Sequence, residues 1–248
     1  MEDFFSRSEA LLGAETMDAL RNKHVILFGV GGVGSWCAEA LIRTGLTHLT
    51  IVDDDVVQES NINRQLPATQ TTIGRAKVEA LKERLLAINP EAEIEARQER
   101  VNGEWLAANG LEGYDYVIDA IDSVADKTDL IIYASRVRVC KVFSSMGAAL
   151  RFYPTQVTVA ELMDVKGDAL AKAVRARMKK IGVKPYKKVK CVYSMEQAVR
   201  IQSIDRFTDR IQAELDKPVS VKGSLMQVTA VFGCTLASLV IEDIRKKS

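Results

Sequence analysis

A glycine-rich run at residues 29–34 has the spacing of a phosphate-binding turn. Its sequence, GVGGVG, follows an apolar run at 24–28 and precedes a helical stretch at 35–44. Glycines at such a junction allow a tight turn, and the amides that begin the following helix can bind phosphate. The glycines expected to approach the ligand are Gly29, Gly31, Gly32 and Gly34. Asp53 ends the next apolar run about 20 residues later, where a carboxylate can accept both ribose hydroxyls. These residues predict an adenine-nucleotide site, without separating a dinucleotide from ATP.

Two cations and a further carboxylate favour a triphosphate over a nicotinamide dinucleotide. Arg64 lies in SNINRQ at 60–65, and Lys77 lies in GRAK at 74–77. An arginine can clamp phosphate oxygens in a fork, and a lysine can neutralise the charge of a leaving pyrophosphate. Asp122 follows a strand candidate and is expected at the carboxyl edge of the sheet, where it could hold Mg²⁺. Each residue alone could be a solvated side chain or a helix cap, so the prediction depends on their joint order.

Strand and helix patterns alternate through the first 150 residues. The strand candidates are 24–28, 49–52, 93–97, 115–119 and 140–144, and the helix candidates are 1–21, 35–44 and 73–88. This alternation predicts an α/β fold with a Rossmann-like, mostly parallel sheet and helices on both faces.

The pattern changes after about residue 150. The candidates there are an alternating antiparallel or edge strand at 155–162, helices at 169–180 and 203–215, and a loop with a strand at 184–193. Because no Gly/Ser-rich linker separates the halves, we expect a nucleotide-binding unit at 1–150. Residues 151–248 are expected to form a C-terminal lobe, with antiparallel strands, that completes the same domain.

The charge of the chain is unevenly distributed. The composition is near average, at 47% hydrophobic and 27% charged residues, which argues against disordered, collagen-like and multi-span membrane proteins. A net charge of +1 alone argues against a nucleic-acid partner, but residues 172–190 hold nine basic and no acidic residues, leaving −8 elsewhere. Charge runs are usually solvated helix faces, yet this segment is a candidate RNA-binding surface. The candidate RNA contacts are Lys179, Lys180, Lys187, Lys188 and Lys190.

The cysteines and one apolar segment indicate in which cellular compartment the protein is expected. The four cysteines form no CxxC motif, which disfavours a zinc ribbon or a redox pair and favours reduced thiols in a cytoplasmic protein. Residues 223–241 contain no charged residue, and this length is borderline for a membrane helix. Polar residues within the segment favour a buried core or dimer-interface helix, with peripheral membrane contact as the less favoured alternative.

Several short motifs follow one another in a definite order. They are GVGGVGS at 29–35, RTG at 43–45, the aspartates at 53–55, SNINRQ at 60–65, GRAK at 74–77, INP at 88–90 and DAIDS at 119–123. Together they resemble the ubiquitin-activating-enzyme-like adenylation family, over roughly residues 7–150. The resemblance implies an ATP-binding adenylation domain at 1–150, with ATP and Mg²⁺ as cofactors.

The resemblance also implies a role for each matching residue. The nucleotide contacts it implies, besides the glycines, are Asp53, Asp55, Asn61, Arg64, Gln65 and Lys77. Among these, Asp53 would bind ribose, and Arg64 and Lys77 would bind the phosphates during catalysis. Asp122 would hold magnesium. Arg7 matches an N-terminal arginine that, in this family, reaches into the ATP site of the partner subunit, which implies a homodimer with Arg7 acting in trans.

Two absences and three further segments point to one branch of the family. Sulfur-carrier adenylyltransferases generally have two CxxC pairs, and the eukaryotic activators have a large catalytic-cysteine domain; this sequence has neither. The segments YPTQVTVAEL at 153–162, VKCVYSMEQ at 189–197 and GSLMQVTAVFG at 223–233 are similar to segments of bacterial tRNA threonylcarbamoyladenosine dehydratases. This branch implies ATP-dependent dehydration, by cyclisation, of threonylcarbamoyladenosine in tRNA through an acyl-adenylate.

Three alternatives stay open. The nearest is an adenylyltransferase that activates the C-terminal Gly-Gly of a ubiquitin-like sulfur-carrier protein. A nicotinamide oxidoreductase would share the glycine turn but leaves Arg64 and Lys77 unexplained, and a non-enzymatic tRNA-binding scaffold would consume no ATP. A sulfur-transfer partner such as a cysteine desulfurase is a further candidate, with Cys191 as a contact, although a structural role for Cys191 is favoured.

Overall fold

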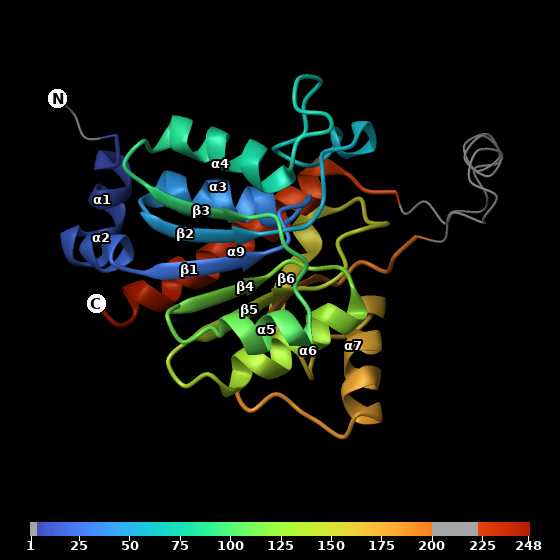
Figure 1. Ribbon diagram of the computed structural model, residues 1–248. Helices are drawn as coiled ribbons and strands as arrows, with labels where there is room; N and C mark the ends of the chain where they lie inside the picture. Colours follow the sequence, from blue (N-terminus) through green and yellow to red (C-terminus); the bar gives the residue numbers. More distant parts are fainter. Residues whose placement is uncertain (1–3, 200–222) are drawn as a thin grey trace.

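The described part of the chain forms a seven-stranded sheet between two layers of helices (Figure 1). The computed structural model describes residues 4–199 and 223–248. The strands are β1 His24–Phe28, β2 His48–Val52, β3 Glu93–Arg97, β4 Tyr116–Asp119, β5 Lys141–Ser145, β6 Val157–Glu161 and β7 Lys190–Ser194. Their order is β3-β2-β1-β4-β5-β7-β6, and every neighbouring pair is parallel except β7 and β6. The predicted α/β fold, mostly parallel with an antiparallel pair toward the C-terminus, is therefore confirmed.

The strands β6 and β7 extend the sheet of the first half. Phe143 of β5 pairs with Lys190 of β7 in parallel register, and Val192 of β7 pairs with Val159 of β6 in antiparallel register. The residues after 150 thus continue the hydrogen-bonded sheet that begins with the first half. The domain boundary at residue 150 stays a prediction.

The central strand β1 is buried on both faces. Val25 and Leu27 belong to one hydrophobic core, and Ile26 and Phe28 belong to the other. Because successive strand residues point to opposite faces, a strand covered on both sides needs an uninterrupted apolar run. This explains the sequence HVILF at the centre of the sheet.

Helices divide between the two faces (Figure 1). The first core includes residues of α2 (Ala14–Arg21), α3 (Gly34–Thr44), α4 (Lys77–Ile88) and α9 (Met226–Arg245). The second core includes residues of α5 (Gly103–Asn109), α6 (Val124–Arg136) and α7 (Ala169–Lys180). The remaining short elements are α1 (Ser6–Leu12), η1 (Glu59–Asn61) and η2 (Pro154–Gln156).

Two predicted helix boundaries were wrong. The predicted helix at 1–21 is divided into α1 and α2 at Gly13, whose φ of +81° ends the first helix. The predicted helix at 73–88 begins only at Lys77, because Ala76 has extended ψ and forms an antiparallel bridge with Val56. The predicted helix at 203–215 lies outside the described residues.

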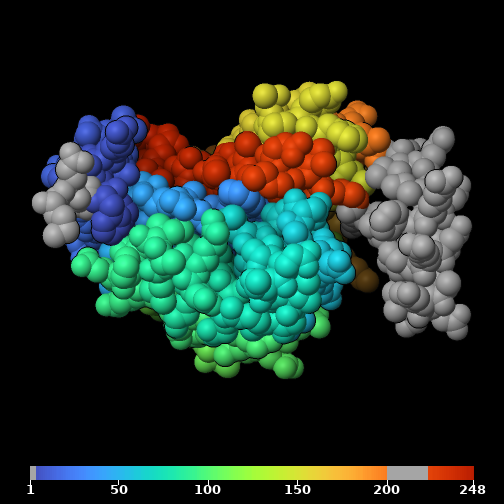
Figure 2. All heavy atoms as spheres, turned by 90° about the horizontal axis from the view of Figure 1, so that it is seen from above, coloured from blue at the N-terminus to red at the C-terminus, as the bar shows by residue number. Residues whose placement is uncertain are grey.

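Helix α9 contains most of the apolar segment predicted at 223–241, but it begins at Met226 and continues to Arg245. Val228, Phe232, Leu236 and Val240 recur at four-residue spacing and are buried in the first core. By length and composition α9 could cross a membrane, but half of its apolar window is buried in the protein. Figure 2 shows its other side at the surface. The helix therefore has a core role, while a dimer interface and peripheral membrane contact stay predictions.

A glycine in α9 sets the close approach of this helix to α3. A Cβ at Gly233 would lie 2.4 Å from the carbonyl oxygen of Val33 and 2.8 Å from the amide nitrogen of Cys37. Since these are backbone atoms, Gly233→Ala must push the helices apart, and overpacking of this kind costs about 1–3 kcal/mol. We expect urea unfolding to show a loss of stability in that range.

The control for this variant is Gly103→Ala. A Cβ at Gly103, the first residue of α5, would meet no atom within 4 Å. The control should leave the free energy of unfolding unchanged or slightly higher, because alanine restricts the unfolded chain. Equal stability of the two variants would contradict a close crossing at Gly233.

Candidate active site

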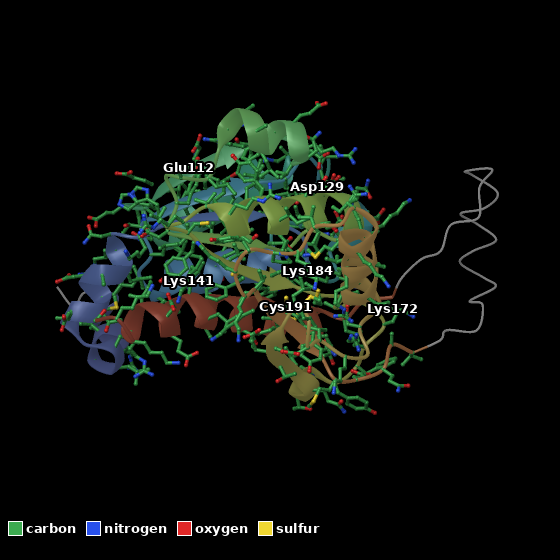
Figure 3. All side chains as sticks on the ribbon, turned by 90° about the horizontal axis from the view of Figure 1, so that it is seen from below. Glu112, Asp129, Lys141, Lys172, Lys184 and Cys191 are labelled. Atoms are coloured by element: carbon green, nitrogen blue, oxygen red, sulfur yellow. The ribbon has the colours of Figure 1, made fainter. Side chains whose placement is uncertain are left out.

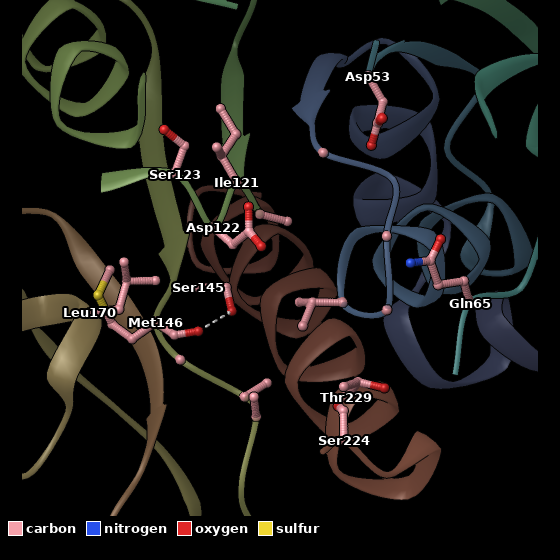
Figure 4. Close-up of a pocket in the computed structure, with 18 of the residues that line it drawn as sticks. Asp53, Gln65, Ile121, Asp122, Ser123, Ser145, Met146, Leu170, Ser224 and Thr229 are labelled. Carbon is pink, nitrogen blue, oxygen red and sulfur yellow. Dashed lines mark hydrogen bonds between the residues drawn. The ribbon is translucent and has the colours of Figure 1, made fainter. Parts of the chain in front are cut away.

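A cavity of about 640 Å³ lies at the carboxyl ends of β1, β2, β4 and β5 (Figure 4). Open α/β sheets bind ligands at this edge, where loops from neighbouring strands meet. The predicted site residues that line the cavity are Gly29, Gly31, Gly32, Asp53, Asp55, Asn61, Arg64, Gln65, Lys77 and Asp122. In Figure 4, Asp53 and Gln65 lie on one side, Met146 and Leu170 on the other, and Asp122 between them.

The glycine turn between β1 and α3 is held by backbone contacts that exclude side chains. Gly29 has a φ of +84°, and a Cβ there would lie 2.8 Å from the carbonyl oxygen of Ala120. A Cβ at Gly34 would lie 1.8 Å from the carbonyl oxygen of Gly29. Gly34 is not among the residues that line the cavity, so its contribution in this structure is to let the turn close on itself.

Asp53 connects the end of β2 to the glycine turn. Its carboxylate accepts hydrogen bonds from the amide of Val30 at 2.8 Å and from the amide of Asp55 at 2.9 Å. Burial raises the pKa of Asp53 above its usual value, and the ammonium of Lys77 opposes this shift. The side chain is therefore oriented by two backbone donors at the cavity edge.

Lys77 is fixed at the cavity by the segment that precedes α4. Its amide donates to the carbonyl of Asp55 at 3.0 Å, and its Nζ donates to the carboxylate of Asp55 at 2.6 Å. The Lys77 side chain is 7% exposed, whereas that of Asp55 is 66% exposed. Because Asp55 is exposed, the ammonium of Lys77 can exchange its ion pair with Asp55 for one with an incoming anion.

The segment from Asn61 to Gln65 contributes a half-buried cation and two buried side-chain amides to the cavity. Asn61 is buried and its Oδ1 accepts from the amide of Gln58 at 3.1 Å. Arg64 is half-buried, and its Nη1 donates to the carbonyl of Ser60 at 3.0 Å and to the Oδ1 of Asn63 at 2.9 Å. Gln65 is buried, and its Oε1 has no hydrogen-bond partner within residues 4–199 and 223–248. This side of the cavity therefore presents one half-buried guanidinium and one buried acceptor without a partner among the described residues.

A buried ion pair supports the loop that carries Asp122. Lys127 of α6 is fully buried, and its Nζ donates to Asp119 at 2.6 Å and to the hydroxyl of Ser144 at 3.2 Å. The other oxygen of Asp119 accepts from the amide of Ile121 at 3.1 Å. The pair thus holds the peptide just before Asp122 at the end of β4.

Sequence reasoning missed Lys127, although a signal for it exists. Lys127 stands on the same helical face as Leu130, Ile131 and Ala134, which are all buried. A lysine on an apolar face is unfavourable unless a carboxylate accompanies it. Asp119, at the end of the preceding strand, is that carboxylate.

Comparison with known proteins identifies the family. The ThiF family profile matches residues 5–247 of this sequence. The chain belongs to the ThiF family. This result confirms the resemblance inferred from the ordered motifs.

Several relatives that match over most of this chain are named tRNA threonylcarbamoyladenosine dehydratase. The tRNA threonylcarbamoyladenosine dehydratase of Bacillus subtilis (strain 168) is 36% identical over 243 residues, which cover 98% of this chain and 94% of that relative. Crystal structures of the E. coli tRNA N6-threonylcarbamoyladenosine dehydratase, TcdA, in complex with ATP and with AMP have TM-scores of 0.85 and 0.86, at 34% and 35% identity. Each covers 98% of this chain and 94% of the other.

A ThiF-family relative of another kind matches over a shorter stretch. The molybdopterin-synthase adenylyltransferase of E. coli (strain K12) is 33% identical over 147 residues, which are 59% of this chain and 57% of that relative. The similarity to dehydratases thus covers nearly the whole chain, whereas the similarity to this adenylyltransferase covers little more than half of it.

Arg7 is apart from the cavity in this ThiF-family chain. It is exposed on α1 and is not among the residues that line the cavity. Figure 1 shows α1 near the start of β1, at the opposite end of the sheet from the carboxyl ends of the strands. A contribution of Arg7 to its own cavity therefore has no support in the structure.

The lysines of the basic segment differ in their surroundings. Lys179 and Lys180 are exposed at the end of α7. The Nζ of Lys187 donates to the carbonyls of Arg138 and Cys140, just after α6, and Lys188 pairs with Glu161 at 2.9 Å. Lys190 is exposed on β7. Lys187 thus has a structural contact that the sequence did not indicate, and the RNA role of the segment stays a prediction.

The cysteines divide into three buried thiols and one exposed residue, Cys234. Cys191, labelled in Figure 3, is fully buried, and burial raises the pKa of its thiol to about 12. A thiol with so high a pKa is a poor nucleophile. This agrees with the favoured structural role of Cys191, and a sulfur-transfer partner stays a prediction.

Proposed function

We propose that this ThiF-family chain catalyses the ATP-dependent dehydration of threonylcarbamoyladenosine in tRNA. One observation carries the proposal: a single cavity joins the glycine turn, Asp53, Lys77 and Asp122, in a chain similar to named dehydratases over 98% of its length. A sulfur-carrier adenylyltransferase would use the same nucleotide contacts, but that similarity covers 59% of the chain.

The glycine-turn side of the cavity fits an adenine nucleotide. A Cβ at Gly31 would meet nothing closer than the side chain of Gln65 at 3.7 Å, so the turn leaves room for a ligand. The buried Gln65 Oε1, which has no partner among the described residues, would accept a hydrogen bond from the nucleotide. Asp53 would accept ribose hydroxyls, and Arg64 and Lys77 would bind phosphate oxygens.

Asp122 is the residue that would hold Mg²⁺. Its side chain is exposed, lines the cavity and has no hydrogen bond or ion pair with another described residue. Carboxylate oxygens are preferred ligands of Mg²⁺, which is held in proteins by one or two carboxylates together with substrate phosphates. Bound there, Mg²⁺ would neutralise phosphate charge.

The proposed reaction has two steps. The carboxylate of the threonylcarbamoyl side chain attacks the α-phosphate of ATP, which forms an acyl-adenylate and releases pyrophosphate. Arg64 and Lys77 would stabilise the charge on the leaving pyrophosphate. A nitrogen or oxygen of the same side chain then attacks the activated carbonyl carbon and loses its proton, and AMP leaves with the carboxylate oxygen. The ring is lighter than the open side chain by one water.

Incubation with ATP, Mg²⁺ and tRNA bearing threonylcarbamoyladenosine tests the proposal. Nucleoside mass spectrometry should show a product lighter by one water. Lys77→Ala should lower the rate by about 100-fold or more, because it removes an electrostatic contact to the leaving group.

Lys82→Ala is the matched control for this loss. Lys82 lies on the same helix as Lys77 and is not among the residues that line the cavity. Its replacement should leave the rate near that of the unaltered protein. An unchanged nucleoside, together with ATP-dependent activation of a Gly-Gly carrier protein, would favour the adenylyltransferase instead.

We also propose that the active unit is a homodimer in which Arg7 completes the partner's cavity. The support is the position of Arg7, which is exposed on α1 at the end of the sheet away from its own cavity. An arginine aimed at a transferring phosphate adds a bidentate contact that only the assembled dimer would provide.

A tandem-tagged heterodimer of Arg7→Ala and Lys77→Ala chains distinguishes action in trans from action in cis. Each variant alone should be nearly inactive. If Arg7 acts in trans, the heterodimer has one wholly intact site. Its activity should then be about half that of a tagged unaltered dimer. An inactive heterodimer would show that Arg7 serves its own chain, and full activity of Arg7→Ala alone would show that Arg7 serves neither site.

We propose that tRNA binds along α7. A tRNA substrate also agrees with the expected cytoplasmic location of the protein. The start of this helix lines the cavity at Ala169 and Leu170, and its last residues are the exposed Lys179 and Lys180. The helix spans about 18 Å, so its basic end lies one helix length from the cavity. Lys172 and Lys184, labelled in Figure 3, belong to the same basic segment.

The double variant Lys179→Gln with Lys180→Gln tests this surface. Its tRNA affinity should fall, and the slope of log affinity against log salt should decrease by about 1–2, because phosphate contacts are lost. ATP affinity should not change. Lys246→Gln with Lys247→Gln, a pair of exposed lysines after α9, is the control. Equal tRNA affinity of the two double variants would overturn the assignment.

A further inference from the structure

The cavity wall opposite the glycine turn contains a buried arginine that the proposed nucleotide contacts leave unused. This wall is formed by residues 147–151, after β5, and by residues 168–170 at the start of α7. In Figure 4, Met146 and Leu170 mark this side, across from Asp53 and Gln65. Arg151 is the cation of this wall, and its side chain is 2% exposed.

The guanidinium of Arg151 is only partly satisfied. Its Nε donates to the carbonyl of Gly147 at 3.0 Å, and its Nη2 donates to the carboxylate of Asp168 at 3.1 Å. Its Nη1 is buried and has no partner within residues 4–199 and 223–248. A buried donor without an acceptor is unfavourable, so such a group in a cavity wall indicates that a ligand supplies the acceptor.

The start of α7 adds positive potential to the same wall. The carboxylate of Asp168 accepts from the amides of Ala171 at 2.8 Å and Gly147 at 3.1 Å. The amides of Ala169 and Leu170 have no acceptor among the described residues, and both residues line the cavity. One carboxylate therefore faces a guanidinium and a helix N-terminus together, and a second anion can be accommodated.

The backbone before Arg151 is held in an unusual conformation. Leu150 has a φ of +61°, in the left-handed region that residues with a Cβ rarely adopt. Its amide donates to the carbonyl of Gly223 at 2.8 Å, and its carbonyl accepts from the amide of Val199 at 3.0 Å. Strain of this kind persists where the surroundings impose it, and it is concentrated at functional sites.

We propose that Arg151, with the amides of Ala169 and Leu170, binds the carboxylate of the threonylcarbamoyl side chain. This inference rests on the proposed function, because that carboxylate is the anion which the substrate brings to the cavity in addition to ATP. A planar guanidinium suits a carboxylate. Lys77 and Arg64 serve the phosphates from the opposite wall, so the two anionic reactants approach between cations that offset their repulsion.

Binding to two tRNAs that differ in one charge tests the inference. One carries threonylcarbamoyladenosine, and the other carries the same side chain with its carboxylate converted into a neutral carboxamide. The unaltered protein should bind the carboxylate form about 10- to 100-fold more tightly, as expected for charge-assisted hydrogen bonds. Arg151→Gln should bind both forms equally, and its ATP affinity should stay unchanged.

A second variant separates substrate binding from folding, because Arg151→Gln leaves Asp168 buried without its cation. Arg151→Gln with Asp168→Asn removes both charges of the pair, and it should fold and still lack the preference for the carboxylate form. Recovery of the preference in this double variant would show that Arg151 only neutralises Asp168, which overturns the inference.

Two further outcomes have distinct meanings. An equal loss of affinity for both tRNAs in Arg151→Gln would assign the contact to a tRNA phosphate and overturn the carboxylate assignment. Failure of the unaltered protein to dehydrate the tRNA would instead contradict the proposed function. Because the binding preference is measured without ATP, the two failures are distinguishable.

Discussion

The contact between the glycine turn and the Ala120 peptide is the constraint on which the rest of the site depends. Because Gly29 has no side chain and a positive φ, the loops that follow β1 and β4 approach to a distance that a Cβ would prevent. Gly34 lets α3 begin directly over the same turn. The nucleotide amides and Asp122 therefore line one cavity, although about ninety residues separate them in sequence.

The buried pair of Asp119 and Lys127 contributes to the geometry of the site more than to the stability of the fold. Desolvation offsets much of the attraction within a buried ion pair, so an apolar pair of similar size could be equally stable. An apolar pair would not accept the amide of Ile121 or bind the hydroxyl of Ser144, as Asp119 does. We infer that the pair is useful because it sets the direction of the loop that presents Asp122.

Features that depend on residues close together in the sequence could be predicted, and features that depend on distant residues could not. The glycine turn and β1 could be predicted because their signals, glycine spacing and a two-sided apolar run, lie within a few residues. The start of α4 was misplaced because Ala76 bridges to Val56, a contact between segments. Arg151 and Lys187 could not be assigned for the same reason: the partners of Arg151 include Asp168, and Lys187 meets carbonyls just after α6. Sequence patterns report periodicity and short motifs, whereas these side chains depend on tertiary neighbours.

The charges that line the cavity explain why it would need additional positive charge to bind a polyphosphate. Seven carboxylates and four cations line it, and the carboxylates of Asp53, Asp54 and Asp55 lie within 4.8 Å of one another. Lys77 is already paired with Asp55, and Arg151 with Asp168, so little free positive charge remains within one chain. A triphosphate and a substrate carboxylate would add several negative charges to a site that is acidic already. A divalent cation at Asp122 and an arginine from a partner chain would supply the missing charge, and each would arrive only when the reacting complex assembles. Such a cavity would bind a triphosphate weakly until the metal and the partner's arginine are in place, which would limit unproductive consumption of ATP.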